Sequence, residues 1–207
     1  MKMNIIVENQ YFAPVSLYTA LSKNSHIVLE QCERYQKRSF RNRCIIAGAN
    51  GPVTLSVPLQ KGREQKTFSR DIRIANQYNW QDQHWKTIVS SYNRSPWFEF
   101  YKYSLEEFYM KRFDFLFDWN LELFYWTIQK LEFDIVAEFT INYEKQYDPE
   151  IFLDLRDKFL PNNYTQFETP VYSQVFMERL GFLPNLSILD LLFCEGKNSS
   201  RLLQFDH

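Results

Sequence analysis

The sequence predicts an α+β or α/β protein with a mixed β-sheet from the N-terminal half, helices packed on it and a helical C-terminal part. Apolar runs of strand length come early in the chain, and longer segments with apolar residues at helical spacing follow. Hydrophobic residues make up 45% and aromatic residues 18% of the 207 residues, which is enough for a buried core. We therefore expect one domain over residues 1–207, sheet-rich and basic over 1–78, helical and acidic over 79–207.

The chain opens with a strand–helix–strand pattern. Asn4–Val7 reads as a short buried strand, and a helix is predicted to begin near Pro14, because proline is favoured in the first helical turn. His26–Glu30, with the sequence HIVLE, reads as the second strand. Such a unit normally forms a right-handed βαβ crossover between parallel strands.

A β-hairpin is predicted near residues 42–58, because Asn50-Gly51 separates two β-rich runs. A two-residue loop at these positions would pair residues whose numbers sum to 101. In that register Cys44 faces the core, whereas Arg41 and Arg43 point to the opposite face. Arg38 is expected to project to the other side from these two arginines.

The remaining chain is predicted to add two strands and several helices. A polar, basic loop over 60–70 leads into this part. We expect a strand at Asp71–Ala75, followed by three helices, at Trp80–Tyr92, from Ser95-Pro96 and over 114–131. A strand at Ile135–Thr140 and an irregular, flap-like segment over 143–172, with a helical turn near 152–159, come next. The last helix is expected to have Ser187 and Asp190 as a capping box and Gly196 as its stop.

Charge is distributed unevenly along the chain. Residues 1–100 hold 14 Lys/Arg against 7 Asp/Glu, a net charge of +7, and residues 101–207 hold 10 against 18, a net charge of −8. This asymmetry suits an anionic ligand and packing between the halves. A general nucleic-acid binder would carry a positive excess overall, so nucleic-acid binding through the basic region 34–73 is the weakest alternative.

Other function classes lack their sequence signals. No GxGxxG or GxxxxGK[ST] motif is present, so the standard dinucleotide and P-loop cradles are excluded. The three cysteines are widely spaced, which predicts neither a metal site nor a disulfide framework. No apolar run is long enough for a membrane span or a signal peptide, so a cytoplasmic protein is expected.

The stretch YQKRSFRNRC carries the candidate binding site. Arg41 and Arg43 on a strand could hold a phosphate or carboxylate in a bidentate fork, and Asn42 and Gln36 could add neutral donors. Lys37 would help to screen the charge of the ligand. The alternative interpretation is a solvated hairpin face, or ion pairs with the acidic half of the chain.

His84 and Tyr11 are the other candidates. His84, in the helical sequence WQDQHW, could transfer protons, because the ordinary pKa of histidine lies near neutrality. The alternative is a histidine at the edge of the core that is held by a hydrogen bond. Tyr11 follows the first strand, where open α/β sheets bind ligands, so it is expected at the mouth of the site.

Several segments together resemble the WbqC-like protein family over about residues 5–203. They are QYFAPVSLYTAL, YQKRSFRNRCIIAGANGPVTLSVPL, DIRI, WQDQHWKTIVSSYNRSPWFEFY, LFDWNLEL and GFLPNLSILDLLFCEG. Many members open with His-Gln-Pro-x-Tyr where this chain reads Glu8-Asn9-Gln10-Tyr11-Phe12, so Tyr11 is retained and the histidine is absent. The segments Arg41-Asn42-Arg43 and Trp80 to Trp85 match the family pattern.

The resemblance implies a bacterial protein linked to O-antigen and other lipopolysaccharide genes, in a family suspected of modifying amino sugars. We expect a cytoplasmic transferase-like enzyme of surface-polysaccharide or nucleotide-sugar metabolism, with acyl or aminoacyl transfer to an amino sugar as the first reaction to test. Its partner would be an anionic sugar nucleotide or acyl donor, with no metal or cofactor, and an oligomer is compatible with this function. The alternative is a non-catalytic ligand-binding or interaction protein of a biosynthetic complex. An enzyme should place His84 near Arg41 and Arg43 in one cleft that also receives Tyr11.

Overall fold

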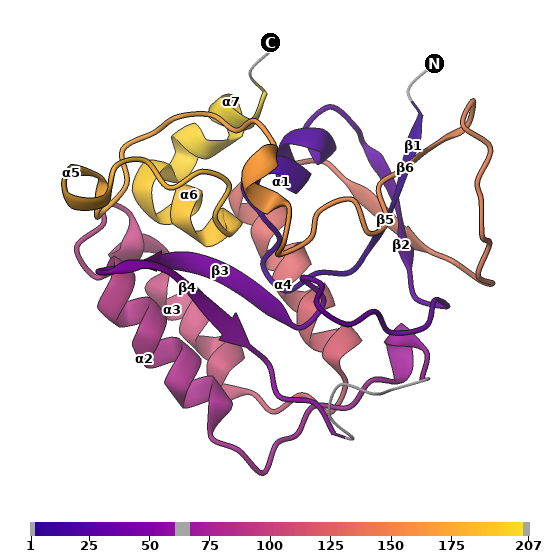
Figure 1. Cartoon of the computed structure of the whole chain (residues 1–207), viewed down its shortest axis with the longest axis horizontal. Helices are drawn as coiled ribbons and strands as arrows, with labels where there is room; N and C mark the ends of the chain where they lie inside the picture. The colour runs from indigo at the N-terminus through magenta and orange to yellow at the C-terminus, as the bar shows by residue number, and fades with distance from the viewer. Residues whose placement is uncertain (1–2, 61–66, 205–207) are drawn as a thin grey trace.

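A four-stranded parallel sheet forms one part of the molecule. The structure, a computed structural model, describes residues 3–60 and 67–204, so residues 61–66 of the predicted loop lie outside it. The strand order is β5-β2-β1-β6, with β1 at Asn4–Glu8, β2 at His26–Glu30, β5 at Val136–Phe139 and β6 at Phe152–Asp154 (Figure 1). All three strand pairs are parallel. The carboxyl ends of the strands therefore meet at one edge, which we call the carboxyl edge.

The predicted βαβ opening is confirmed. Helix α1 spans Val15–Leu21 and connects β1 to β2, which pair in register from Ile5 with Ile27 to Glu8 with Glu30. Pro14 is the N-terminal capping residue of α1, directly before its first turn. The three central residues of β1 and of β2 are apolar, because these strands lie in the middle of a parallel sheet.

Strand β6 replaces the helical turn that was predicted near residues 152–159. Phe152–Asp154 pair with β1, and the backbone N–H of Leu155 donates to Ile6. Leu155 and Phe159 are buried. A strand of three residues is too short to show a period in the sequence, so its pairing with β1 decides its conformation. This part of the expected flap is anchored in the sheet.

The hairpin forms, but two residues away from the expected register. Strands β3, Arg43–Gly48, and β4, Gly51–Ser56, pair with numbers that sum to 99, so Arg43 lies opposite Ser56. Gly51 has φ of 123° and occupies a strand position, so the loop is Ala49-Asn50. A shift of two preserves the alternation of faces, so Cys44 faces the core as predicted.

The strand predicted at Asp71–Ala75 is not formed. Ser69–Asp71 make a 3-10 turn, and only isolated bridges follow, from Leu59 to Ile74 and from Arg73 to Phe115. The alternating apolar residues of this segment are nevertheless buried, as Ile72 and Ile74 show. The alternation predicted burial correctly, but no strand runs beside the segment for long enough to form a ladder.

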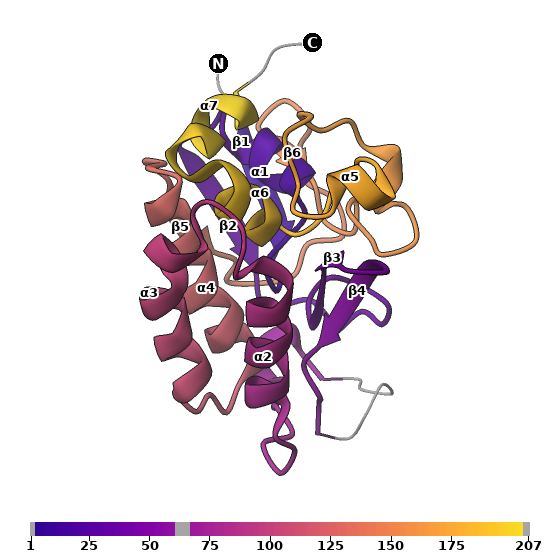
Figure 2. The same cartoon turned by 90° about the vertical axis from the view of Figure 1, so that its left-hand side faces the viewer.

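Helices cover the rest of the molecule: α2 at Trp80–Tyr92, α3 at Phe98–Met110, α4 at Leu116–Lys130, α5 at Met177–Leu180, α6 at Ile188–Glu195 and α7 at Ser199–Leu203. Figure 2 shows α3 and α4 on one side, β3 and β4 on the other, and α2 between them. The β3 strand contacts both α2 and α6. Helix α3 begins two residues after Pro96, because Ser95 donates to the carbonyl of Tyr92 and closes a turn first.

The start of α6 corrects one predicted role. The Ser187 side chain caps the helix by accepting from the backbone of Leu189, as expected. Asp190 does not complete a capping box; it is fully buried and accepts hydrogen bonds from Tyr92, Tyr172 and Gln174. It therefore joins α2, α6 and the segment before α5. No helix among residues 3–60 and 67–204 has the length and apolar character needed to cross a membrane.

Candidate functional site

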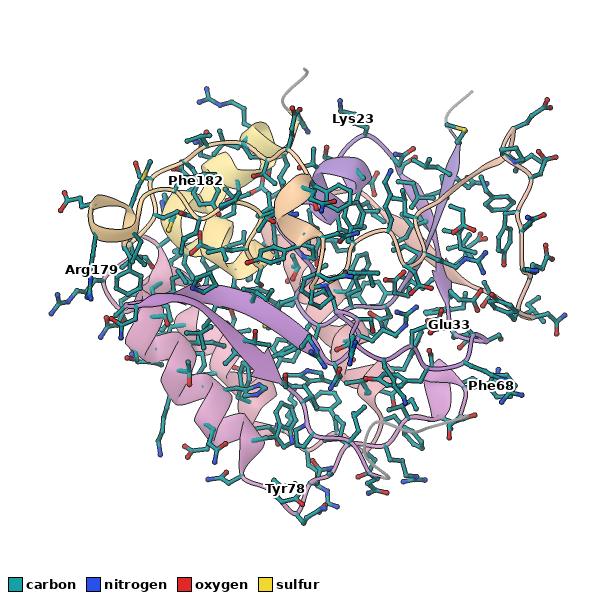
Figure 3. The ribbon with its side chains drawn as sticks, viewed as in Figure 1. Lys23, Glu33, Phe68, Tyr78, Arg179 and Phe182 are labelled. Atoms are coloured by element: carbon teal, nitrogen blue, oxygen red, sulfur yellow. The ribbon has the colours of Figure 1, made fainter. Side chains whose placement is uncertain are left out.

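The segment over residues 31–42 organises the candidate site. It leaves β2 at the carboxyl edge and runs to β3, and its side chains line three cavities. Gln36 lines one cavity and Lys37 lines another, so these two cavities flank the segment. Figure 3 shows Glu33 just beyond the ends of β1 and β2, with Phe68 further out at the surface.

The basic cavity has a volume of about 330 Å³ and holds three cations. Lys37, Arg38 and Arg43 line it together with Asn42 and Ser56, and its described lining contains no carboxylate. The prediction that Arg38 points away from the other cations was wrong. Arg38 has φ of 56°, and this left-handed backbone turns its side chain to the same cavity. The predicted residues Lys37, Asn42 and Arg43 are therefore brought together.

Arg43 and Asn42 are oriented from the hairpin. Arg43 begins β3 and is half-buried, and its Nε atom has no hydrogen-bond partner among the described residues. The Asn42 amide donates to the carbonyl of Val57 at 2.9 Å and accepts from the hydroxyl of Tyr35 at 2.9 Å. One N–H of Asn42 remains beyond these two bonds, because a primary amide carries two donors.

Arg41 is not part of this cavity. It was predicted to face away from the core, but it is only 2% exposed. Its Nε and Nη2 donate to the two oxygens of Glu33 at 2.6 and 2.7 Å, and Nη1 lies 2.9 Å from Asp157 without hydrogen-bond geometry. Burial alone lowers the pKa of Arg41, but the charges of Glu8, Glu33 and Asp157 raise it above its ordinary value. Arg41 therefore follows the alternative interpretation, in which an arginine of this stretch forms ion pairs with the acidic half of the chain; Asp157 belongs to that half.

Carboxylates gather at the carboxyl edge around Arg41. Glu8 and Glu30 end β1 and β2 side by side and are fully buried. Glu8 accepts from Gln10 and from the backbone of Asp157, and Glu30 accepts from Thr140 and Arg156. Burial raises the pKa of Glu8 and of Glu33, and Arg41 opposes both shifts. Two buried acids with raised pKa values at a sheet edge mark a site of interest.

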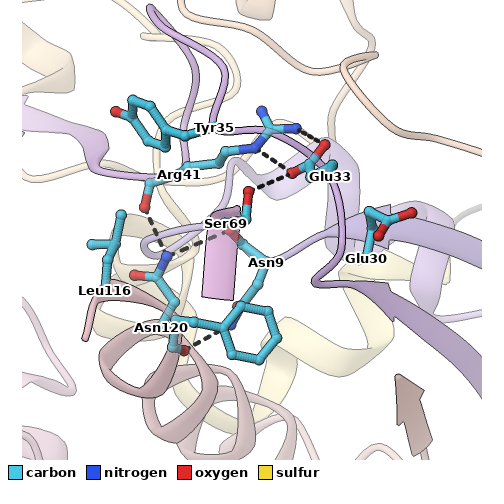
Figure 4. Close-up of a pocket in the computed structure, with 9 residues that line it drawn as sticks. Asn9, Glu30, Glu33, Tyr35, Arg41, Ser69, Leu116 and Asn120 are labelled. Atoms are coloured by element: carbon cyan, nitrogen blue, oxygen red, sulfur yellow. Dashed lines mark hydrogen bonds and ion pairs between the residues drawn. The ribbon is translucent and has the colours of Figure 1, made fainter. Parts of the chain in front are cut away.

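Two cavities lie at this edge. The outer cavity, of about 270 Å³, is lined by Cys32, Glu33, Arg34, Gln36, Phe68, Tyr143, Arg156 and Asp157. The inner cavity has room for about 10 Å³ and lies between Glu33, Arg41, Asn9 and Asn120 (Figure 4). Asn120 donates to the carbonyl of Arg41 at 2.7 Å, and Asn9 donates to that of Phe117 at 2.9 Å. The Oδ1 atoms of Asn9 and Asn120 have no partner among the described residues.

Tyr11 and His84 form a separate, buried pair. Tyr11 is 0% exposed, so its predicted place at the mouth was wrong. Its hydroxyl lies 3.0 Å from Nδ1 of His84 and 2.7 Å from the hydroxyl of Tyr109. His84 is 6% exposed and packs against Trp80, and burial lowers its pKa to about 4, while a hydrogen bond to the Ser56 backbone opposes the shift. At neutral pH His84 is therefore uncharged.

The predicted residues thus lie in four places, and the single cleft expected to hold Arg41, Arg43, His84 and Tyr11 is not formed. Lys37, Asn42 and Arg43 share the basic cavity, Gln36 lines the outer cavity, and Arg41 lines the inner cavity. Tyr11 and His84 meet each other in the core, where His84 approaches the backbone of Ser56, a residue of the basic cavity.

The acidic residues of the carboxyl edge were missed by the sequence analysis, although a signal for them exists. Glu8 and Glu30 each follow an apolar strand of the predicted βαβ unit. Because parallel strands end at one edge, two terminal glutamates predict a shared carboxylate site. Glu33 and Asp157 have no comparable signal, because their approach depends on how the later chain returns to the sheet.

Comparison with known protein families gives a match over most of the chain. A family model for the WbqC-like protein family matches residues 9–164 and 144–202 of this chain. No curated protein and no solved structure matches it. The two matched ranges cover both the basic half with its hairpin and the acidic half that supplies Asp157 and α6. The chain therefore belongs to the WbqC-like protein family.

Proposed function

We propose that the protein binds a phosphate- or carboxylate-bearing small molecule in the basic cavity and acts on it as a transferase-like enzyme of surface-polysaccharide or nucleotide-sugar metabolism. The basic cavity carries this proposal. Three cations line it, no described lining residue is acidic, and Arg43 keeps an unpartnered Nε. An unsatisfied guanidinium N–H is costly unless an acceptor such as a phosphate oxygen reaches it.

Each lining residue has a distinct role in this proposal. Arg43 holds the anion through its Nε and its remaining donors, and Lys37 and Arg38 supply charge. The second N–H of Asn42 orients the ligand, because its other N–H is already bonded to Val57. The anionic group would belong to a sugar nucleotide or an acyl donor, and acyl or aminoacyl transfer to an amino sugar is the reaction class that fits.

His84 acts in this proposal as a positioning residue. Its Nδ1 is bonded to Tyr11, its ring is almost fully buried, and its low pKa keeps it neutral. It supports β4 at Ser56 and so the wall of the basic cavity. A proton-transfer role would require contact with a ligand, which the burial of the ring opposes.

A thermal-shift and calorimetric screen tests the binding. Nucleotide sugars, acyl-CoAs and amino acids are screened on the parent chain, on Arg43→Gln and on Arg94→Gln. Arg94 is exposed between α2 and α3, outside the basic cavity, and serves as the matched control. We expect an anionic ligand to bind the parent and the control equally, and to bind Arg43→Gln at least about tenfold more weakly. Equal binding to all three chains contradicts the proposal.

One observation favours a second candidate, a non-catalytic ligand-binding or interaction protein. His84 is buried and bonded, as a structural histidine would be. The two functions differ in turnover. The ligand from the screen is incubated with amine and hydroxyl acceptors, and products are followed by mass spectrometry. Formation of a transfer product that depends on Arg43 supports the enzyme, and binding without any product supports the alternative.

A further inference from the structure

We propose that the carboxyl edge is a second subsite, which binds the free amino group of a ligand through the oxygens around Asp157 and the inner cavity. This inference rests on the proposed function, because it names the chemistry of a second substrate group. The subsite and the basic cavity lie on opposite sides of the segment over residues 31–42. The two cavities differ in their lining: the outer cavity has the carboxylates of Glu33 and Asp157 beside Arg34 and Arg156, whereas the described lining of the basic cavity has no carboxylate.

The position of the outer cavity supports the subsite. Its lining residues come from chain segments that directly follow three parallel strands: Glu33 after β2, Tyr143 after β5 and Asp157 after β6. Open sheets of parallel strands bind ligands outside their carboxyl ends. The cavity opens to solvent, because the side chain of Asp157 is 44% exposed.

Asp157 is held where a ligand can reach it. Its backbone has φ of 54°, and its N–H donates to the buried carboxylate of Glu8 at 3.0 Å. This strained, anchored turn points the carboxylate toward Nη1 of Arg41 at 2.9 Å. One ion-pair contact leaves most of the four acceptor positions of the carboxylate for a ligand donor.

Two neighbouring arginines, Arg41 and Arg156, make their hydrogen bonds to groups other than Asp157. Arg41 makes its two short hydrogen bonds to Glu33. Arg156 donates to both oxygens of Asp154, to Glu30 and to the carbonyl of Glu144. Five carboxylates, those of Glu8, Glu30, Glu33, Asp154 and Asp157, lie around these two guanidinium groups, and Arg34 is a third arginine at the outer cavity.

The inner cavity supplies an independent observation. Asn9 and Asn120 are 6% and 1% exposed and line it, and the Oδ1 atom of each lacks a donor among the described residues. The inner and outer cavities share Glu33. These two amide oxygens need hydrogen-bond donors, and an ammonium group offers three. The Nη1 atom of Arg41, which also lines the cavity, is a donor without a hydrogen-bond acceptor among the described residues. The volume of about 10 Å³ fits a group of that size.

Two sugar phosphates that differ only at nitrogen test the subsite. Glucosamine 1-phosphate carries a free amine, whereas N-acetylglucosamine 1-phosphate carries an uncharged amide. Their dissociation constants are measured by calorimetry on the parent chain, on Asp157→Asn and on Asp134→Asn. Asp134 is an exposed aspartate before β5, at the opposite end of the sheet, and provides the matched control.

We expect the parent and Asp134→Asn to prefer the free amine by roughly tenfold, and Asp157→Asn to lose most of that preference. Equal affinity of the parent for the two sugars overturns the inference, as does a preference that survives Asp157→Asn or an absence of any binding of glucosamine 1-phosphate. The comparison on the parent needs no variant, so it decides even if Asp157→Asn fails to fold. Failure of the proposed function is recognised separately, because Arg43→Gln would then bind the nucleotide sugars of the screen as well as the parent does.

Discussion

Replacing Arg41 by Met should remove a large part of the free energy of unfolding of this protein. Arg41 is 2% exposed and is the cation shared by Glu33, Asp157 and the nearby Glu8, whose oxygen lies 3.8 Å away. Methionine has a similar length and no charge, so Glu8 and Glu33 would stay buried without their cation. Removing one partner of a buried ion pair costs about 3–5 kcal/mol, against a total stability of about 5–15 kcal/mol.

The loss should depend on pH in a defined direction. Burial already raises the pKa of Glu8 and Glu33 in the folded protein, and removing Arg41 removes the charge that opposes the shift. The unfolded chain releases these protons near pH 4.5, the ordinary value, while the folded variant keeps them to higher pH. The folded state then binds more protons, so its stability falls as pH rises above about 4.5. The deficit should therefore be larger at pH 7 than at pH 5.

Urea unfolding followed by circular dichroism at pH 5 and pH 7 measures this deficit. Arg112→Met is the control, because Arg112 makes a solvent-exposed contact of 3.5 Å with Asp114, and only a small change is expected there. Adding Glu33→Gln to Arg41→Met should recover part of the loss. A deficit below about 1 kcal/mol at pH 7, or one of equal size at both pH values, would refute the reasoning.

Two further predictions concern His84 and Gly196. The pKa of His84 is lowered to about 4, below its ordinary 6.5, so its contribution to stability is present above pH 6.5 and is lost as pH falls toward 4. We expect this loss to be about 3 kcal/mol in the parent and to be missing in His84→Gln. Urea unfolding across this pH range measures it. A pH profile that is identical in both chains would count against this assignment. Gly196→Ala should cost at least about 2 kcal/mol, because φ is 55° and the new Cβ would overlap the ring of Trp97. Gly181→Ala, with φ of 73° and open space around it, should cost clearly less in the same unfolding assay, and equal losses would show that the overlap relaxes.

Much of the local structure could be predicted because its causes are local. The bounds of α2 and β2 follow from apolar periodicity, and Ser187 caps α6 through its own backbone neighbour. The predicted faces of β3 also hold, because alternation survives a register shift of two. The errors lie where distant segments decide: β6 forms through its pairing with β1, and the segment after Asp71 has no neighbouring strand of sufficient length.

The candidate site shows the same division. The sequence by itself determined that cations would gather near the hairpin, because Lys37, Arg38, Arg41 and Arg43 are close along the chain. Only the tertiary structure decided which of them face a ligand. Arg41 pairs with Glu33 and Asp157 and does not line the basic cavity. Arg38, which has a left-handed backbone, lines that cavity. The physical reason is that a charge takes its partner from whatever the fold brings within a few ångströms, and Asp157 lies 116 residues away from Arg41 along the chain.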